Sequence, residues 1–124
     1  NPEQELNTLW WQLVTKYQLL TKPEGRNNAD WASKIHIALY PCYYHNYLLG
    51  ELLASQLSYY IKTNVLDTPA ENTINISGHP AAGDYLKEKV FQTGARLQWN
   101  DMIKSATGEE LTAKYYSMDF IKKY

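Results

Sequence analysis

The chain has 124 residues and a mass of 14.4 kDa, with 44% hydrophobic and 20% charged residues, which predicts one ordinary globular domain that folds as a unit. Its twelve basic and thirteen acidic residues leave a net charge of −1 without a basic run, which argues against nucleic-acid or anionic-membrane binding. The single cysteine, Cys42, excludes an internal disulfide and every multi-cysteine metal or redox motif. No apolar run is long enough to span a bilayer, so we expect a soluble chain.

The first helix is predicted over residues 3–21, where apolar residues recur at steps of three and four and form one stripe. The stripe consists of Leu6, Leu9, Trp10, Leu13, Val14, Tyr17 and Leu20. Pro23, with the glycine and asparagines that follow it, indicates a loop. Residues 31–39 fit two structures, because the apolar residues from Ile35 to Leu39 alternate as in a strand while neighbouring positions fit a helix. We interpret them as a short extended or mixed segment.

The longest apolar run, residues 42–65, follows Pro41 and predicts a central helix of about six turns. Because this helix is apolar nearly all round, we expect it to be buried. Residues 66–78 are rich in Asp, Asn, Pro and Gly and predict a loop. Further helices are predicted over residues 79–93, 99–106 and 110–124. Four or five helices with almost no strand predict an all-α fold with one long buried central helix.

No self-contained catalytic motif, such as H-E-x-x-H or a phosphate-binding loop, occurs in the sequence, so we do not expect this chain alone to be an active enzyme. What remains is a polar and aromatic cluster between Lys34 and Tyr47. In an extended segment Lys34 and His36 point to the same face, while Tyr44 and Tyr47, three residues apart, share a face of the next helix. A cation, an imidazole and two phenols suit a carboxylate and a developing oxyanion. The alternative is that these side chains make ordinary structural contacts.

Six short segments carry an ordered set of motifs. Residues 10–20 match W-W-x-L-x-x-K-Y-Q-x-L, and residues 32–37 match A-x-K-F-H-I except that Ile35 replaces the phenylalanine. The others are a proline turn near Pro23, a tyrosine pair like P-Y-x-x-Y, a G-x-x-L at 83–86, and residues 94–108, where G-A-R-L-Q-W-N-D followed by T-G resembles a G-x-S-R-P-W-x-E to T-G run. In this order the motifs resemble the C-terminal part of the angiotensin-converting enzyme family of zinc peptidyl-dipeptidases. A related tyrosine-rich helix also occurs in oligopeptidases of the same fold.

The resemblance implies a role for each residue of the cluster. Lys34 matches the lysine that binds the terminal carboxylate of the substrate, and Tyr44 matches the tyrosine that assists it. His36 matches the histidine that donates to the substrate backbone near the scissile bond, and Tyr47 matches the tyrosine that stabilises the oxyanion. His36 and the tyrosine pair are one residue further apart than in the family pattern, so Tyr43 also fits the part given to Tyr44.

The resemblance further implies that residues 1–124 form a single helical segment, the C-terminal subdomain of a zincin-type helical peptidase. The H-E-x-x-H helix and the third zinc ligand are absent from the sequence, so zinc is expected in a full-length parent and not in this chain. The implied activity of that parent is the release of dipeptides from peptide C termini. The alternative, from another class, is a non-catalytic helical module that binds a peptide or protein.

The partners implied are a peptide with a free C terminus and the N-terminal, zinc-binding half of the parent, with no nucleic acid. An isolated segment is expected to form a homodimer through its tyrosine-rich face. The parent is expected outside the cytoplasm, in the periplasm or secreted. The absence of the paired cysteines of the animal enzymes fits a bacterial homologue.

Overall fold

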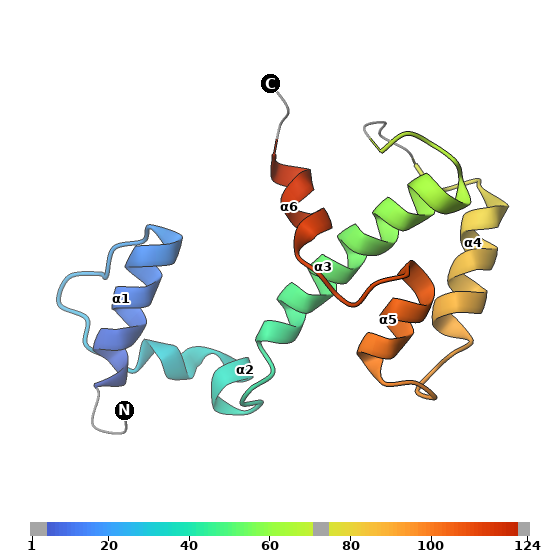
Figure 1. Cartoon of the computed structure of the whole chain (residues 1–124). Helices are drawn as coiled ribbons and strands as arrows, with labels where there is room; N and C mark the ends of the chain where they lie inside the picture. The colour runs from blue at the N-terminus through green and yellow to red at the C-terminus, as the bar shows by residue number, and fades with distance from the viewer. Residues whose placement is uncertain (1–4, 71–74, 122–124) are drawn as a thin grey trace. The chain divides into compact units, whose positions relative to one another are not determined.

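The computed structural model describes residues 5–70 and 75–121, and its contacts group the chain into two compact units, residues 1–46 and 47–124. Every regular element in the described residues is helical, which confirms the predicted all-α class (Figure 1). The α-helices are α1 Leu6–Gln18, α2 Ile35–Ala38, α3 His45–Tyr60, α4 Pro80–Leu86, α5 Trp99–Thr107 and α6 Lys114–Phe120. None of the described helices has the length and apolar character needed to cross a membrane.

Helix α1 opens the first unit and confirms the helix predicted there. The carboxylate of Glu5 caps it by accepting hydrogen bonds from the backbone N–H groups of Asn7 and Thr8, which satisfies donors that the first turn leaves without partners. Hydrogen bonding by the side chain of Thr8 lowers the pKa of Glu5 most, and the backbone N–H groups of Thr8 and Asn7 lower it further. The helix ends where Leu19 adopts a left-handed conformation at φ 58°, so the chain leaves the helix before Pro23.

The segment that follows the first loop is helical, not extended. A 3₁₀ turn, η1 (Asp30–Ser33), leads into the single turn of α2, and only Lys34 between them is extended, at φ −86° and ψ 112°. The extended interpretation of residues 31–39 was therefore wrong, and the helical alternative holds in the two turns on either side of Lys34. The alternation of three apolar residues is too short a pattern to distinguish a strand from two tight helical turns.

Helix α3 confirms the long central helix, although it begins at His45, three residues after the predicted start. It continues into one π-helical segment, η2 (Ile61–Val65). The expected burial on all sides is not observed, because Gln56 is the buried residue of α3 and Ile61 that of η2. An apolar helix in a chain of this length is covered on one face by its neighbours, and its other faces remain partly exposed.

The remaining helices of the second unit confirm their predicted positions. Helix α4 continues into a π-helical segment, η3 (Lys87–Phe91), and α5 ends at Gly108, whose φ of 84° suits a residue without a Cβ. Helix α6 begins four residues later than predicted. The described parts of the predicted loop, residues 66–70 and 75–78, contain no helix, whereas residues 71–74 and 122–124 lie outside the described residues.

The core of the second unit is formed where α4, α5, η2 and η3 pack together. Its buried apolar residues are Ile61, Ala82, Ile103 and Ala106. At the edge of this core Tyr85 stacks on Tyr60, with ring centroids 5.5 Å apart, and donates a 2.7 Å hydrogen bond to the carbonyl of Ala106. Burial raises the pKa of Tyr85 to about 12.

Candidate functional site

The rings of His36, Tyr43 and Tyr44 form one aromatic group in the first unit. The centroid of His36 lies 6.3 Å from that of Tyr43, in a stacked arrangement with 15° between the planes. It lies 5.5 Å from that of Tyr44, with the planes tilted by 57°. Both tyrosines are about half exposed, so the group lies at the surface of the described chain. These three residues, which the sequence predicted as site residues, are therefore brought together.

A tight turn between α2 and α3 produces this arrangement. The backbone N–H groups of Leu39 and Tyr40 donate to the carbonyl of Ile35 and close α2. Cys42 then adopts φ 60°, a left-handed conformation that reverses the chain after Pro41. The reversal returns the next two residues of the chain, both tyrosines, to the side of α2 that carries His36.

Lys34 and Tyr47 are the other two residues predicted for the site. Lys34 is exposed and occupies the N-cap position of α2, one residue before the helix begins. The expectation that Lys34 and His36 share a face assumed an extended segment, and α2 removes that argument because His36 lies inside a helical turn. Tyr47 lies in the first turns of α3, is 55% exposed and belongs to the second unit. Its predicted role as oxyanion donor stays a prediction.

The aromatic group offers directed hydrogen-bond donors on an exposed surface. A tyrosine hydroxyl donates one hydrogen bond, and an imidazole donates one when neutral and two when protonated. Donors of this kind suit a carboxylate or a peptide carbonyl, and a lysine close in the sequence adds a positive charge. Both Tyr43 and Tyr44 contact the imidazole, so the choice between them for carboxylate binding stays open.

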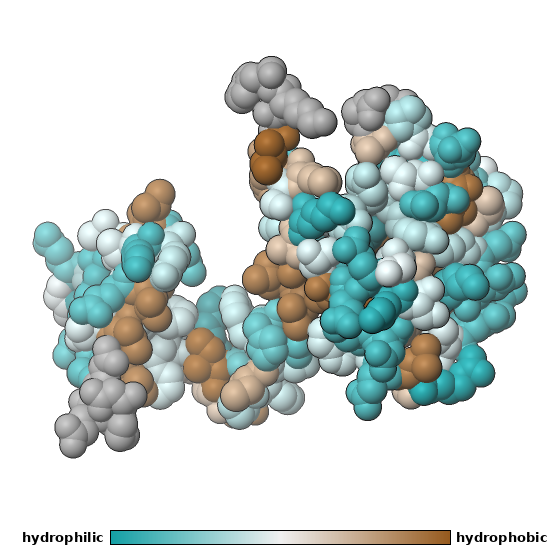
Figure 2. Space-filling view, viewed as in Figure 1, coloured by the Kyte–Doolittle hydropathy of each residue, from teal (hydrophilic) through white to brown (hydrophobic). Residues whose placement is uncertain are grey.

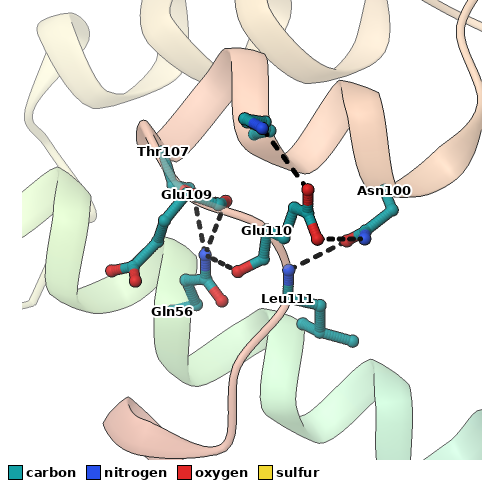
Figure 3. Close-up of polar contacts among 7 residues, drawn as sticks. Gln56, Asn100, Thr107, Glu109, Glu110 and Leu111 are labelled. Carbon is teal, nitrogen blue, oxygen red and sulfur yellow. Dashed lines mark hydrogen bonds and ion pairs between the residues drawn. The ribbon is translucent and has the colours of Figure 1, made fainter.

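Sequence reasoning missed a buried polar centre in the second unit. The side chain of Gln56 is fully buried on α3, where its Nε2 donates to the hydroxyl of Thr107 at 2.8 Å and to the carbonyls of Glu109 and Glu110 (Figure 3). Its Oε1 accepts from the backbone N–H of Thr112 at 3.1 Å. A glutamine within an apolar helical run was the available signal, since a polar side chain on such a face needs buried partners.

A second layer of polar contacts surrounds the loop between α5 and α6. Asn100 accepts a 2.9 Å hydrogen bond from the backbone N–H of Leu111 and donates to Glu110, which also pairs with Lys104 at 3.3 Å (Figure 3). These contacts lie on the loop that Gln56 holds. The loop is therefore fixed from α3 and from α5, which identifies the cluster as a structural centre.

A metal centre does not fit the described part of the chain. Residues 5–70 and 75–121 contain no group of three or more His, Cys, Asp or Glu side chains arranged to hold a metal ion. A catalytic zinc site takes three protein ligands of these types. We therefore assign no ligand role to His36, His45 or His79.

Over more than half of its length the chain is similar to known peptidases. The family model of the carboxypeptidase Taq (M32) metallopeptidases matches residues 35–124, well over half of the chain. Thermostable carboxypeptidase 1 of Pyrococcus furiosus is 29% identical over 82 residues, which are 66% of this chain and 16% of the relative. The chain thus matches only a small part of the length of this relative. No solved structure matches the chain.

The match confirms the prediction that the chain is related to zinc metallopeptidases, and the matching family is one of carboxypeptidases. The more specific resemblance to angiotensin-converting enzyme is not confirmed by these comparisons. His36, Tyr43, Tyr44 and Tyr47 lie within the matched range, and Lys34 lies one residue before it.

Proposed function

The chain belongs to the carboxypeptidase Taq (M32) metallopeptidase family, and from this premise we propose that it is the substrate-binding C-terminal part of a zinc peptidase that acts on the C termini of peptides. In this proposal the chain contributes one wall of the substrate site. The dipeptide-releasing activity that the motif resemblance implies is the more specific form of the proposal. Release of single residues is the form suggested by the name of the Pyrococcus relative.

The observation that carries the proposal is the contact of His36 with Tyr43 and Tyr44 inside the matched range. Three side chains of residue types that can donate hydrogen bonds meet at one exposed place, close in the sequence to a lysine. A peptide C terminus presents a carboxylate and a carbonyl, and both accept such bonds. We assign the carboxylate to Lys34 with either tyrosine, and the substrate backbone to His36. Tyr47 is assigned to the oxyanion.

The zinc ion of the proposed enzyme is assigned to polypeptide outside these 124 residues, because the described residues offer no ligand set. When bound, a catalytic zinc supplies an activated water and polarises a carbonyl. The residues of this chain bind and orient the substrate and stabilise charge. The proposed partner of the chain is therefore the zinc-binding part of an M32 polypeptide.

The proposal predicts that Lys34→Ala weakens the binding of peptides with a free C terminus and spares amidated peptides, since the lost contact is to a carboxylate. In the polypeptide that the whole reading frame encodes, KM for the free peptide should rise on the order of tenfold or more, as for a lost charge-assisted hydrogen bond. Mass spectrometry of the products distinguishes release of dipeptides from release of single residues. Lys89→Ala, an exposed lysine of η3, is the matched control.

Equal losses on free and amidated peptides would contradict the assignment of Lys34. A polypeptide that binds such peptides without cleaving them would contradict the peptidase proposal and favour the non-catalytic binding module. Before either assay, the reading frame upstream of Asn1 should be sequenced. It is expected to encode H-E-x-x-H and a glutamate on a later helix.

A further inference from the structure

Part of the apolar stripe of α1 is exposed in the first unit, although Val14 of the same stripe is buried. The sequence marks this stripe as the face that a globular protein buries. In the structure Leu6 is 47% exposed, Leu13 45%, Tyr17 71% and Leu20, just beyond the helix, 55%. Apolar side chains accordingly lie along the surface of α1 (Figure 2). The residues of α1 that are buried are Asn7 and Val14.

Polar contacts fix this orientation of the helix. The indole N–H of Trp11 donates a 2.9 Å hydrogen bond to Asp30, whose other carboxylate oxygen pairs with Arg26 at 2.6 Å. The amide of Asn7 donates to Asn27 at 3.3 Å. Each contact joins the other side of α1 to the loop or to η1. The unit therefore buries Asn7 and Val14 on one side of α1 and leaves Leu6, Leu13 and Tyr17 exposed on another.

The exposed members of the stripe are uncharged, and the ammonium of Lys16 lies over the ring of Tyr17, 5.1 Å from its centroid. Leu6, Leu13 and Tyr17 follow spacings of seven and four residues, which place them on one face of α1, and Leu20 lies beyond the end of the helix. A contiguous apolar face of this kind marks an interaction surface in a folded protein. A second helix with its own apolar stripe fits such a surface, because the side chains of the two helices then interdigitate.

We propose that the stripe of α1 is the docking surface for a helix in the part of an M32 polypeptide that lies outside these 124 residues. The length of the family argues for this occupant, because the matched part of this chain amounts to 16% of the Pyrococcus relative. The remaining polypeptide of such a protein needs an apolar contact surface on this chain. The inference rests on the proposed function in one respect, because both take the chain as part of an M32 polypeptide.

The test is the accessibility of a thiol placed on the stripe. Leu13→Cys is compared with Gln12→Cys, which is exposed and points about 100° away around the helix. Both variants are made in the polypeptide encoded by the whole reading frame. Alkylation at each position is followed by peptide mass spectrometry, so that Cys42 and other thiols do not interfere. We expect Cys at position 13 to react on the order of a hundredfold more slowly than at position 12, since it reacts only after local opening.

The same pair in the 124-residue chain at low concentration should react at rates that agree within several-fold. If Leu13→Cys impairs folding, Tyr17→Cys compared with Gln18→Cys provides the second measurement. Equal rates in the whole polypeptide would overturn the proposal, as would a reading frame that holds only these residues. Protection that appears in the 124-residue chain and is lost on dilution would overturn it in favour of a second copy. Protection without peptidase activity would retain the docking surface and reject the proposed function.

Discussion

The carboxamide of Gln56 uses both of its ends inside the second unit. Its Nε2 donates hydrogen bonds to Thr107, Glu109 and Glu110, and its Oε1 accepts one from the backbone N–H of Thr112. An amide suits this position because it provides donors and an acceptor on one planar group. The three acceptors come from a segment more than fifty residues further along the chain, so this side chain stabilises a long-range contact of α3.

Gln56→Leu should lower the free energy of unfolding of the second unit by about 2 kcal/mol or more, because buried backbone groups lose their partners. Urea unfolding followed by circular dichroism measures the change. Gln92→Leu, at an exposed position in the same unit, should change stability by less than about 0.5 kcal/mol. Similar values for the two variants would show that the buried amide contributes nothing specific.

Tyr85 makes the stability of the second unit sensitive to alkaline pH. Burial raises its pKa from 10.0 to about 12, so the folded state holds the proton of its hydroxyl longer than the unfolded state does. The contribution of the protonated Tyr85 hydroxyl to the stability of the second unit is fully present below pH 10 and is lost as the pH rises towards 12. Thermal unfolding between pH 9 and 12 should therefore show a smaller decrease for Tyr85→Phe than for the wild-type chain. Parallel decreases would mean that Tyr85 titrates alike in both states.

At the scale of elements, the long periodic patterns were sufficient to predict the helices. The apolar steps of three and four predicted α1, and the uninterrupted run after Pro41 predicted α3. Gly108 stands where α5 ends, as its freedom at positive φ suggests. The continuation of α3 into a π-helical segment could not be predicted, because that hydrogen-bond shift depends on the packing of η2 against α4.

Three of the residues predicted for the candidate site lie together, for a different reason from the one predicted, and their roles stay predictions. His36, Tyr43 and Tyr44 were identified from their chemistry and from the motif resemblance, and their rings do meet. The element that brings them together is the turn at Cys42, a residue that seldom adopts φ 60° and gives no turn signal in the sequence. The assumed extended strand gave a different and incorrect reason for their convergence.

At the scale of the whole molecule, burial was the property that the sequence predicted least well. The long helix α3 was expected to be buried, yet α3 and the stripe of α1 both expose apolar side chains in the described chain. Apolar periodicity indicates which face becomes buried in the complete protein, and it does not indicate whether the burying partner belongs to the same 124 residues. This distinction is consistent with a chain that matches 16% of its relative.

The chain and the whole M32 polypeptide should respond differently to removal of metal. A chelator should abolish the peptidase activity of the polypeptide, because the proposed reaction needs a zinc-activated water. It should leave the Tm of the 124-residue chain unchanged within about 1 °C, since the described residues offer no group of three metal ligands and a structural zinc would contribute directly to folding. Differential scanning fluorimetry with and without chelator measures the second effect, and readdition of zinc controls for the first. A Tm that falls with chelator and recovers with zinc would place a metal site within this chain.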